Sequence, residues 1–288
     1  MKKTVFVVGE GRLGNQLFIA AFIDGHYPTD TKVISTGLQE MEKGFDWDRD
    51  AKMLVPQKWK TRFLIRMARR LANLRLIKHI FQTKFEVNLP HGRYRLLDDK
   101  IRKTAGLLPI TLIDRSPVQD HHHVREIRFR LKDRYKTAAR EFLARLPEGP
   151  RAFIHVRRGD YKEWTIIGKS PLLPISYFEE GIERIRAANP DTIFICISDN
   201  IEEVRAALNS ERLYFFNGKN VYEDFAMMTL CDGGIVSNST LSWWGGYLSG
   251  RNIPVIAPEN WVGFPVGFEY PVGIVGDWMQ TIAVKQDH

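Results

Sequence analysis

The feature that most constrains the fold is a regular alternation of short apolar runs and amphipathic segments after residue 150. The apolar runs carry no polar face, which is typical of strands that are buried on both sides. Helical spacing follows each run after a short connection, so the sequence predicts a parallel α/β sheet covered by helices. The predicted strands are residues 151–156, 192–197, 213–216, 234–237 and 254–257, and the predicted helices are residues 176–188, 201–208, 222–231 and 241–248.

The first half of the chain opens in a similar way. Residues 4–8 predict a buried strand that leads into a glycine-rich turn, residues 17–23 a helix and residues 32–35 a second strand. Two later segments combine apolar residues at spacings of three and four with many basic residues. We therefore predict a basic amphipathic helix or helix pair over residues 59–80 and a second basic helix over 124–146.

The domain boundary is predicted from a cluster of helix-breaking residues, Pro-Glu-Gly-Pro at 147–150. It divides the chain of 288 residues into a domain over 1–148 and a second over 149–288. With 44% hydrophobic residues, the chain has enough apolar side chains for packed cores. Cys196 and Cys231 are the two cysteines and lack metal-type or redox-type spacing, so a disulfide scaffold is excluded.

The positive charge is concentrated in one segment. Residues 58–145 hold 23 Lys+Arg and 8 Asp+Glu, a net of +15 within a chain whose total is +8, so the remainder is acidic. Such a segment indicates a phosphate-rich partner or an anionic membrane, or else a solvated helix surface. The apolar run near the N-terminus is too short for a signal peptide and no run approaches a membrane span, so we expect a soluble or peripheral protein.

A glycine-rich sequence, Gly-Glu-Gly-Arg-Leu-Gly at 9–14, lies between the first predicted strand and helix. This spacing matches the dinucleotide-binding fingerprint, which requires an acidic residue at the end of the next strand to hold a ribose. The next strand ends near residue 36 without such an acid. A nicotinamide-dependent enzyme therefore stays a minor alternative.

The strongest chemical signal is His-Val-Arg-Arg-Gly-Asp-Tyr at 155–161, where a buried strand delivers four ionisable residues at its carboxyl end. Ligands bind at that end in open α/β sheets. Paired guanidinium groups suit a diphosphate because they offer fixed parallel donors to phosphate oxygens. The competing interpretation is an Arg–Asp ion pair that closes a turn.

A second strand exit carries hydroxyl groups, Ser-Asn-Ser-Thr at 237–240, directly before a predicted helix. These groups suit either helix capping or phosphate binding at the helix N-terminus. Trp243 and Trp244 follow, and we interpret them as core residues. Asp199 and Asp224 lie near later strand exits, and either carboxylate is suited to accept the two donors on one edge of guanine.

The His triplet at 121–123 raises the question of a metal site. Adjacent side chains on a helix or strand do not converge, so no metal site is predicted there.

Three segments together resemble the motifs of bacterial α-1,2-fucosyltransferases, glycosyltransferase family 11. The resemblance is firm over roughly residues 4–25 and 151–262, and loose over 40–145, where acceptor recognition would be expected. The motif segments are residues 11–18, 155–161 and 237–246, in the family's order and spacing.

This resemblance implies an α/β fold of GT-B type, with two Rossmann-like domains whose parallel sheets face a central cleft. It implies GDP-β-L-fucose as the donor, bound mainly by the C-terminal domain. Transfer would be inverting and independent of metal, giving an α-1,2-fucoside, and no cofactor is expected.

Motif position also implies roles for single residues. Arg157 would grip the β-phosphate, Arg158 would brace the pyrophosphate or the loop, and His155 would orient the donor. Asp160 stays open between a catalytic group and a structural partner of Arg158, and no general base is identified. The other implied residues are Asp224 or Asp199 at the guanine edge, Asn238, Ser239 and Thr240 at the phosphates, and Gly14, Asn15 and Gln16 facing the fucose and the acceptor.

The resemblance implies a galactose-containing acceptor, with a lipid-linked unit of a bacterial surface polysaccharide such as O-antigen as its setting. We therefore expect a cytoplasmic protein, peripheral on the inner membrane, with residues 58–80 as the docking segment. The alternatives are another GDP-sugar transferase of the same fold and a non-enzymatic binder of anionic polymers. Nucleic acid is not an expected partner because the basic segment lacks any known nucleic-acid motif.

Overall fold

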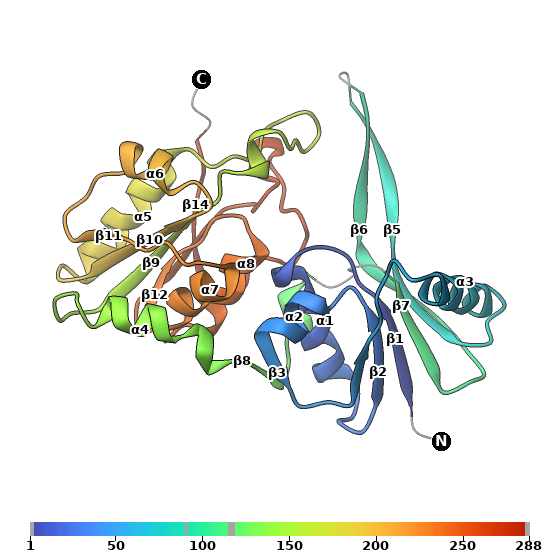
Figure 1. Ribbon diagram of the computed structural model, residues 1–288. Coiled ribbons are helices and arrows are strands. Elements are labelled where there is room, and N and C mark those ends of the chain that lie inside the picture. Colours follow the sequence, from blue (N-terminus) through green and yellow to red (C-terminus); the bar gives the residue numbers. More distant parts are fainter. Residues whose placement is uncertain (1–2, 90–91, 115–118, 286–288) are drawn as a thin grey trace. The chain divides into compact units, whose positions relative to one another are not determined.

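The chain forms two compact units, Met1–Arg130 and Leu131–His288, each with an α/β sheet (Figure 1). The predicted boundary after residue 148 lies inside the second unit. A segment before it belongs there because Phe142 packs with its ring 5.3 Å from that of Phe216. The computed structural model describes residues 3–89, 92–114 and 119–285.

The second unit contains a parallel sheet of six strands in the order β11-β10-β9-β12-β13-β14. Numbered within the unit, this order is 3-2-1-4-5-6, the order of the doubly wound dinucleotide-binding fold. The direction in which strands are added reverses between β9 and β12. The strands are β9 (Arg151–Val156), β10 (Ile193–Ser198), β11 (Leu213–Phe215), β12 (Gly233–Ile235), β13 (Val255–Pro258) and β14 (Met279–Ile282).

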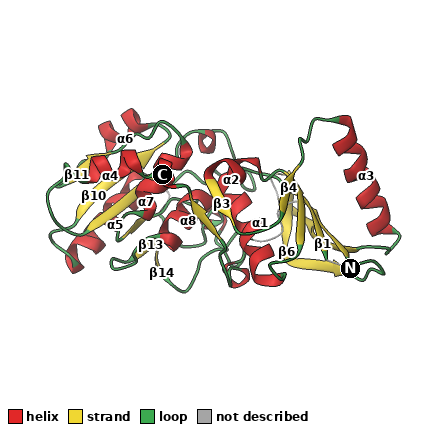
Figure 2. Ribbon diagram, turned by 60° about the horizontal axis from the view of Figure 1, so that its bottom comes forward, coloured by secondary structure: helices red, strands yellow, loops and turns green. Residues whose placement is uncertain are grey.

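Helices cover both faces of this sheet (Figure 2). On one face, Tyr177 and Phe178 join a buried cluster with the strand residue Ile154. On the other face lie Trp243 and Trp244, both 0% exposed, which confirms their interpretation as core residues. The helices are α4 (Thr137–Leu143), α5 (Ile175–Ala188), α6 (Ile201–Ala207), α7 (Val221–Thr229) and α8 (Thr240–Leu248), with short 3₁₀ turns at Asp133–Tyr135, Asp160–Lys162 and Phe264–Val266.

The first unit has a sheet in the order β4-β2-β1-β7-β5-β6, in which only the β5–β6 pair is antiparallel. These two strands extend as a long hairpin (Figure 1). The strands are β1 (Thr4–Val8), β2 (Lys32–Thr36), β4 (Ala51–Met53), β5 (Lys78–Leu89), β6 (Gly92–Thr104) and β7 (Ile110–Asp114), and a separate pair joins β3 (Phe45–Trp47) to β8 (Phe129–Leu131).

One helix covers each face of this first sheet. Ile19 and Phe22 from α1 pack against Val5 and Val33, whereas Ala72 from α3 packs against Phe6 on the opposite face. The helices are α1 (Leu13–His26), α2 (Gln39–Gly44) and α3 (Trp59–Asn73), followed by a 3₁₀ turn at His121–His123. Among the described residues, none of the helices combines the length and the apolar character needed to cross a bilayer.

Two predicted helices are shorter than expected. The helix predicted over 59–80 ends at Asn73, and Lys78 already begins strand β5. The segment 124–146 is mostly extended or 3₁₀, with a regular helix only over Thr137–Leu143. The elements predicted after residue 150 are confirmed to within about two residues, and β14 was not predicted.

Candidate active site

The candidate site lies at the carboxyl ends of β9 and β12, at the reversal of strand order in the second unit. β12 pairs directly with β9, from Gly233 opposite Ala152 to Ile235 opposite Ile154. The segments that follow the two strands therefore leave the sheet side by side. In doubly wound folds ligands bind at this topological switch point.

Arg157 is the first residue after β9, and two carboxylates hold its guanidinium group. Its Nε and Nη2 donate to Asp160 Oδ1 at 3.0 and 2.7 Å, and its Nη1 lies 2.9 Å from Asp199 Oδ2. The Arg157 side chain is only 16% exposed, so these pairs fix its direction. Asp160 thus contacts Arg157 rather than Arg158, the partner considered from the sequence.

Arg158 points the other way, into the protein. It is 6% exposed, its Nη1 donates to the carbonyl of Leu173 at 2.8 Å, and its Nε lies 3.7 Å from Glu203 Oε1. The sequence left two roles for Arg158, bracing the pyrophosphate or bracing the loop. The contacts with Leu173 and Glu203 provide partners for the second role.

Asp199 holds the backbone of the turn that follows Arg157. Its Oδ1 accepts from the backbone N–H of Arg158 at 2.8 Å and of Gly159 at 3.3 Å, while its Oδ2 pairs with Arg157. A Cβ on Gly159 would lie 2.5 Å from Asp199 Oδ2, so a side chain at this position would displace the carboxylate. Asp199 therefore already holds this turn and Arg157, and of the two acids considered for guanine, Asp224 is the one that makes its backbone hydrogen bond elsewhere, with Gly218 N.

His155 connects the end of β9 to the segment after β12. Its Nδ1 lies 2.8 Å from Ser237 Oγ, and Ser242 Oγ donates to the carbonyl oxygens of Ser237 and Ser239, each at 3.0 Å. Burial lowers the pKa of His155 to about 4, so the imidazole is neutral near pH 7. His155 thus positions the start of α8 without adding charge.

The hydroxyl segment leads into α8 without side-chain capping. Ser239 occupies the N-cap position but makes no capping hydrogen bond, which removes capping as the full explanation for this segment. Thr240 follows as the first helical residue. Asn238 is buried, and its Nδ2 donates to the carbonyl of Pro171 at 2.8 Å, so this side chain holds a loop.

Asp224 lies in the first turn of α7. Its Oδ1 accepts from the backbone N–H of Gly218 at 3.0 Å. Burial is the main cause that raises the pKa of Asp224 to about 7, the Gly218 hydrogen bond opposes it, and the charge of Glu223 adds to it. A carboxyl group with a strongly shifted pKa near a strand exit is a candidate ligand-binding group.

The three residues predicted to face the acceptor lie in the first turn of α1. Gly14 and Gln16 are buried, and Gln16 uses both ends of its amide: Nε2 donates to Gly11 O at 3.1 Å and Oε1 accepts from Met41 N at 3.0 Å. Asn15 is partly exposed and accepts from Gln119 Nε2 at 2.9 Å. Gln16 therefore braces the loop, and Asn15 is the more accessible side chain.

The nicotinamide alternative finds no support in the first unit. Gly9 N donates to Thr36 O at 2.7 Å, and a Cβ on Gly37 would lie 2.3 Å from Gly9 O. The end of β2 thus packs directly onto the glycine-rich turn. An acidic ribose-binding side chain is missing at this position, as the sequence indicated.

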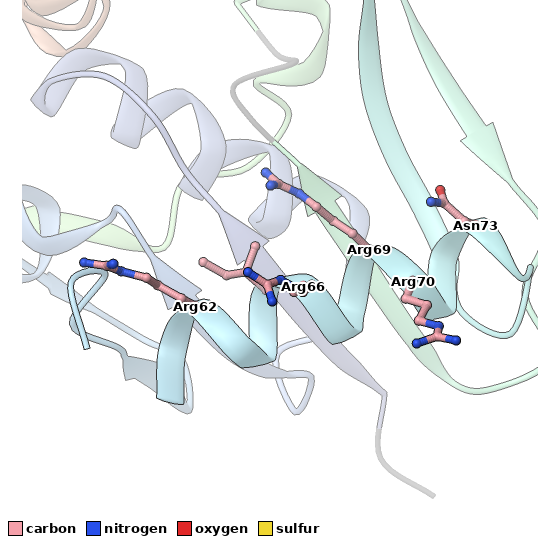
Figure 3. Close-up of a pocket in the computed structure, with 6 residues that line it drawn as sticks. Arg62, Arg66, Arg69, Arg70 and Asn73 are labelled. Atoms are coloured by element: carbon pink, nitrogen blue, oxygen red, sulfur yellow. The ribbon is translucent and has the colours of Figure 1, made fainter. Parts of the chain in front are cut away.

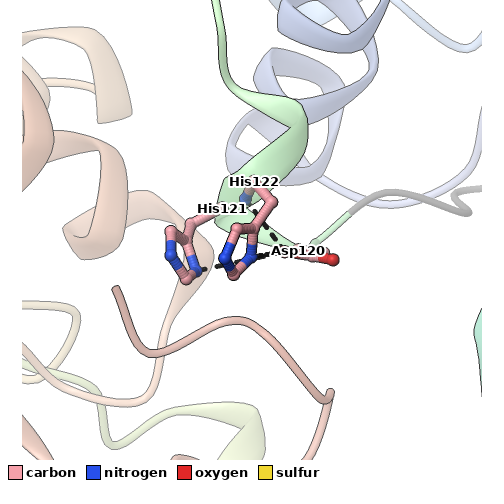
Figure 4. A group of neighbouring side chains, drawn as sticks. All are labelled: Asp120, His121 and His122. Carbon is pink, nitrogen blue, oxygen red and sulfur yellow. Dashed lines mark hydrogen bonds and ion pairs between the residues drawn. The ribbon is translucent and has the colours of Figure 1, made fainter. Parts of the chain in front are cut away.

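The His triplet departs from the sequence expectation. Ligand atoms of Asp120, His121 and His122 all lie within 4.8 Å of one another (Figure 4). The 3₁₀ turn brings the His121 and His122 rings together, with their centroids 4.0 Å apart. His122 Nδ1 lies 2.8 Å from Asp120 Oδ1. The geometric reason against convergence was therefore wrong, although a short hydrogen bond already joins two of the three groups, Asp120 and His122.

Sequence reasoning missed two residues that support the predicted site residues. Glu203 on α6 pairs with both Arg158 and Lys162, and Gln119 contacts Asn15 from 104 positions away. Neither belongs to a motif. The position of Glu203 in the helix after Asp199 was a usable signal, because that helix starts at the same edge of the sheet.

Comparison with solved structures addresses the fold. A structure described as glycosyl transferase family 9 from Veillonella parvula superposes with a TM-score of 0.55 at 13% identity, over 99% of this chain and 88% of that chain. With two α/β units built on parallel sheets, this likeness defines the fold as the GT-B type of the glycosyltransferases.

The profile of Glycosyl transferase family 11 matches residues 4–266, and the chain belongs to this family. A "Galactoside alpha-(1,2)-fucosyltransferase 1" from Leontopithecus chrysomelas is 29% identical over 157 residues, 47% of this chain and 42% of the relative. An "O-antigen biosynthesis glycosyltransferase WbnK" from Escherichia coli is 29% identical over 114 residues, 38% of each chain. Each match thus spans less than half of the relative's length.

Proposed function

We propose that this protein transfers L-fucose from GDP-β-L-fucose to the 2-hydroxyl group of a galactoside, with inversion and without a metal ion. Membership of glycosyl transferase family 11 and the similarity to a galactoside α-1,2-fucosyltransferase support fucose as the sugar. The acceptor we propose is a galactose-containing unit of a bacterial surface polysaccharide, carried on a lipid at the cytoplasmic face of the inner membrane.

The observation that carries this proposal is the fixed guanidinium group of Arg157 at the switch point of the second sheet. Asp160 and Asp199 fix the orientation of this group through ion pairs. The N-terminus of α8, which has no side-chain cap, follows the neighbouring strand β12. A guanidinium group and the backbone N–H groups of a helix N-terminus both bind phosphate oxygens well. Asp224 adds a carboxylate for the two donors of a guanine edge.

In the proposed reaction the bond between fucose C1 and the β-phosphate oxygen breaks, and the galactose 2-oxygen bonds to C1 from the opposite face. The β-linked donor therefore yields an α-linked product. GDP leaves with the bonding electrons, and Arg157 stabilises the charge that develops on its phosphate. The acceptor hydroxyl proton leaves to water or buffer late in the step.

The product test uses a panel of galactosides with GDP-fucose, GDP-mannose and UDP-sugars as donors. We expect one added deoxyhexose with GDP-fucose only, joined through an α-1,2 linkage that mass spectrometry and NMR identify. We also expect the rate to stay within about twofold when EDTA is added, because the guanidinium group supplies the charge that a metal would otherwise provide. Transfer from GDP-mannose instead would identify a different GDP-sugar transferase.

The Asp120, His121 and His122 cluster supplies the control for the EDTA experiment. A His121→Ala/His122→Ala variant should show the same insensitivity to EDTA as the wild type. Strong stimulation by Mn²⁺ or Mg²⁺ that disappears in this variant would contradict the metal-independent mechanism and assign the metal to the cluster.

The pH dependence of GDP binding tests the role of Asp224. A carboxylate accepts the guanine donors only when ionised, and with a pKa of about 7 its ionised fraction rises between pH 6 and pH 8. GDP affinity is therefore expected to rise roughly tenfold over this range in the wild type. In Asp224→Asn the affinity at pH 8 should be lower and this rise should disappear.

Calorimetric titrations of both proteins at each pH make the measurement. The phosphate groups of GDP titrate in the same range, but they do so equally for both proteins, so the difference between them isolates Asp224. Equal pH profiles for wild type and Asp224→Asn would refute the assignment of this carboxyl to guanine.

A further inference from the structure

Helix α3 packs on the first unit through a narrow face. Only Thr61 and Ala72 are buried, and Ile65, Ala68 and Leu71 are partly buried against the sheet. At 100° per residue, these side chains lie on one side of the helix. The opposite side of a helix attached in this way is expected to be polar.

That opposite side instead carries large apolar side chains beside arginines. Trp59 is 73% exposed, Phe63 54%, Met67 37% and Leu74 61%, and their spacings of four, four and seven place them on one line. We call these four residues the outer stripe. Leu64 beside it is 46% exposed. Aromatic and long aliphatic side chains so exposed on one side of a helix mark a contact surface.

The outer stripe is bordered by positive charge. Residues 51–85 contain ten Lys and Arg residues and no Asp or Glu. Arg62, Arg66, Arg69 and Arg70 are spaced along the helix (Figure 3) and line a surface groove of about 540 Å³ together with Ile65 and Asn73. Arg69 forms two hydrogen bonds of 2.8 Å with Asp114. Among the described residues, Arg62, Arg66 and Arg70 have no carboxylate partner.

The loop before β7 extends the apolar surface. Leu108 N donates to Leu76 O at 2.8 Å, which places this loop beside the C-terminal end of α3. Leu107 in the same loop is 84% exposed and Leu108 is 42% exposed. The apolar surface therefore continues past the end of the helix.

We propose that α3 docks this protein on the anionic surface of a phospholipid bilayer, lying in the plane of the interface. The outer stripe would enter the boundary between headgroups and acyl chains, where tryptophan is favoured. Arg62, Arg66 and Arg70 would pair with lipid phosphates, and each basic group near an anionic surface adds attraction. The two kinds of contact together provide the two signals that stable peripheral binding requires.

Charge favours a bilayer over other occupants of this surface. A second copy of α3 would bring two rows of arginines together, and like charges oppose that contact. A nucleic acid would engage the arginines but would leave the aliphatic part of the outer stripe in water. An anionic bilayer satisfies the arginines and the apolar side chains at once.

Vesicle flotation tests this proposal with the full chain and needs no enzymatic activity. We expect binding to phosphatidylglycerol–phosphatidylcholine vesicles at low salt, weak binding to pure phosphatidylcholine, and loss of binding at high salt. The double variant Arg66→Glu/Arg70→Glu should bind at least about tenfold more weakly to the anionic vesicles, because four units of charge are changed at the surface.

Two further variants separate charge from apolar insertion. Phe63→Ser/Met67→Ser should weaken vesicle binding by about tenfold or more while leaving the net charge unchanged. The matched control Arg140→Glu/Arg145→Glu changes the same net charge on the second unit and should bind like the wild type. In addition, the emission of Trp59, obtained as the difference between wild type and Trp59→Phe, should shift to the blue when vesicles are added.

The inference is overturned if neither pair of α3 variants changes vesicle binding, or if the control pair weakens it equally. It is also overturned if ultracentrifugation shows a dimer that Phe63→Ser/Met67→Ser dissociates, while vesicles are not bound. The α3 variants should keep wild-type turnover with a soluble galactoside. Vesicle binding is measured without enzymatic activity, so failure of the proposed transfer reaction would not change how the vesicle result is interpreted.

Discussion

Replacing Arg157 by alanine is expected to lower kcat/KM for fucosyl transfer by roughly 100- to 1,000-fold, the usual effect of losing one group aimed at developing charge. The guanidinium group is held by Asp160 and Asp199 before any donor binds, so no reorganisation is needed when the phosphate arrives. Arg157→Lys should recover only part of the activity, because an ammonium group cannot donate in parallel to two acceptors. Initial rates with GDP-fucose and a soluble galactoside make the measurement.

The matched control is Arg184→Ala on α5. Arg184 forms an exposed pair with Glu180 in the same unit, at a distance of 2.6 Å, and its removal should leave the rate unchanged. Circular dichroism of each variant checks that the fold is retained. Near-normal turnover in a folded Arg157→Ala protein would remove Arg157 from the proposed mechanism.

Replacing Asp24 by alanine is expected to reduce the free energy of unfolding of the first unit by about 3–5 kcal/mol, the usual result of removing one partner of a buried ion pair. Asp24 and Arg49 have fully buried side chains. Asp24 also accepts from Trp47 Nε1 at 3.1 Å and from the backbone N–H of Arg128 at 2.9 Å, whereas Arg49 donates to the Tyr27 carbonyl at 2.8 Å. The substitution would leave the guanidinium group buried without its counter-charge.

Hydrogen exchange of the α1 amides follows this unit separately, since a chain of two units does not unfold in one step. Asp46→Ala is the control, because Asp46 and Arg130 are exposed and 3.9 Å apart, and the expected change is about 0.5 kcal/mol or less. Equal protection of α1 in wild type and Asp24→Ala would contradict the stabilising role of the buried network.

The second unit was predictable because its pattern is redundant. Five apolar strands alternate with four segments of helical spacing between residues 151 and 257, so errors at single boundaries do not alter the topology. The first unit offered a misleading pattern. Leu74 and Ile77 continue the helical spacing of α3, but the chain leaves the helix at Arg75, whose φ is 56°. Ile77 and Lys78 then pack against Gly106 at close range, a tertiary contact that helical spacing does not reveal.

The sequence predicted which motif residues lie at the same edge of the sheet, but predicted their contacts with one another less well. Strand exits placed Arg157, Asp199 and Ser237 at one edge of the sheet, as the structure has them. Sequence spacing did not reveal that Arg157 and Arg158 would point in different directions. Successive side chains of an extended chain alternate sides, so one guanidinium group faces the carboxylates and the other enters the protein.

The close packing of Gly159 against Asp199 has a consequence for sequence variation. The carboxylate holds two backbone N–H groups and the Arg157 guanidinium group together, and a Cβ on Gly159 would lie 2.5 Å from that carboxylate. A larger residue at position 159 would therefore displace the Asp199 carboxylate and weaken its hold on Arg157. The two positions are expected to covary as a pair, and libraries that alter donor preference should vary both together or neither.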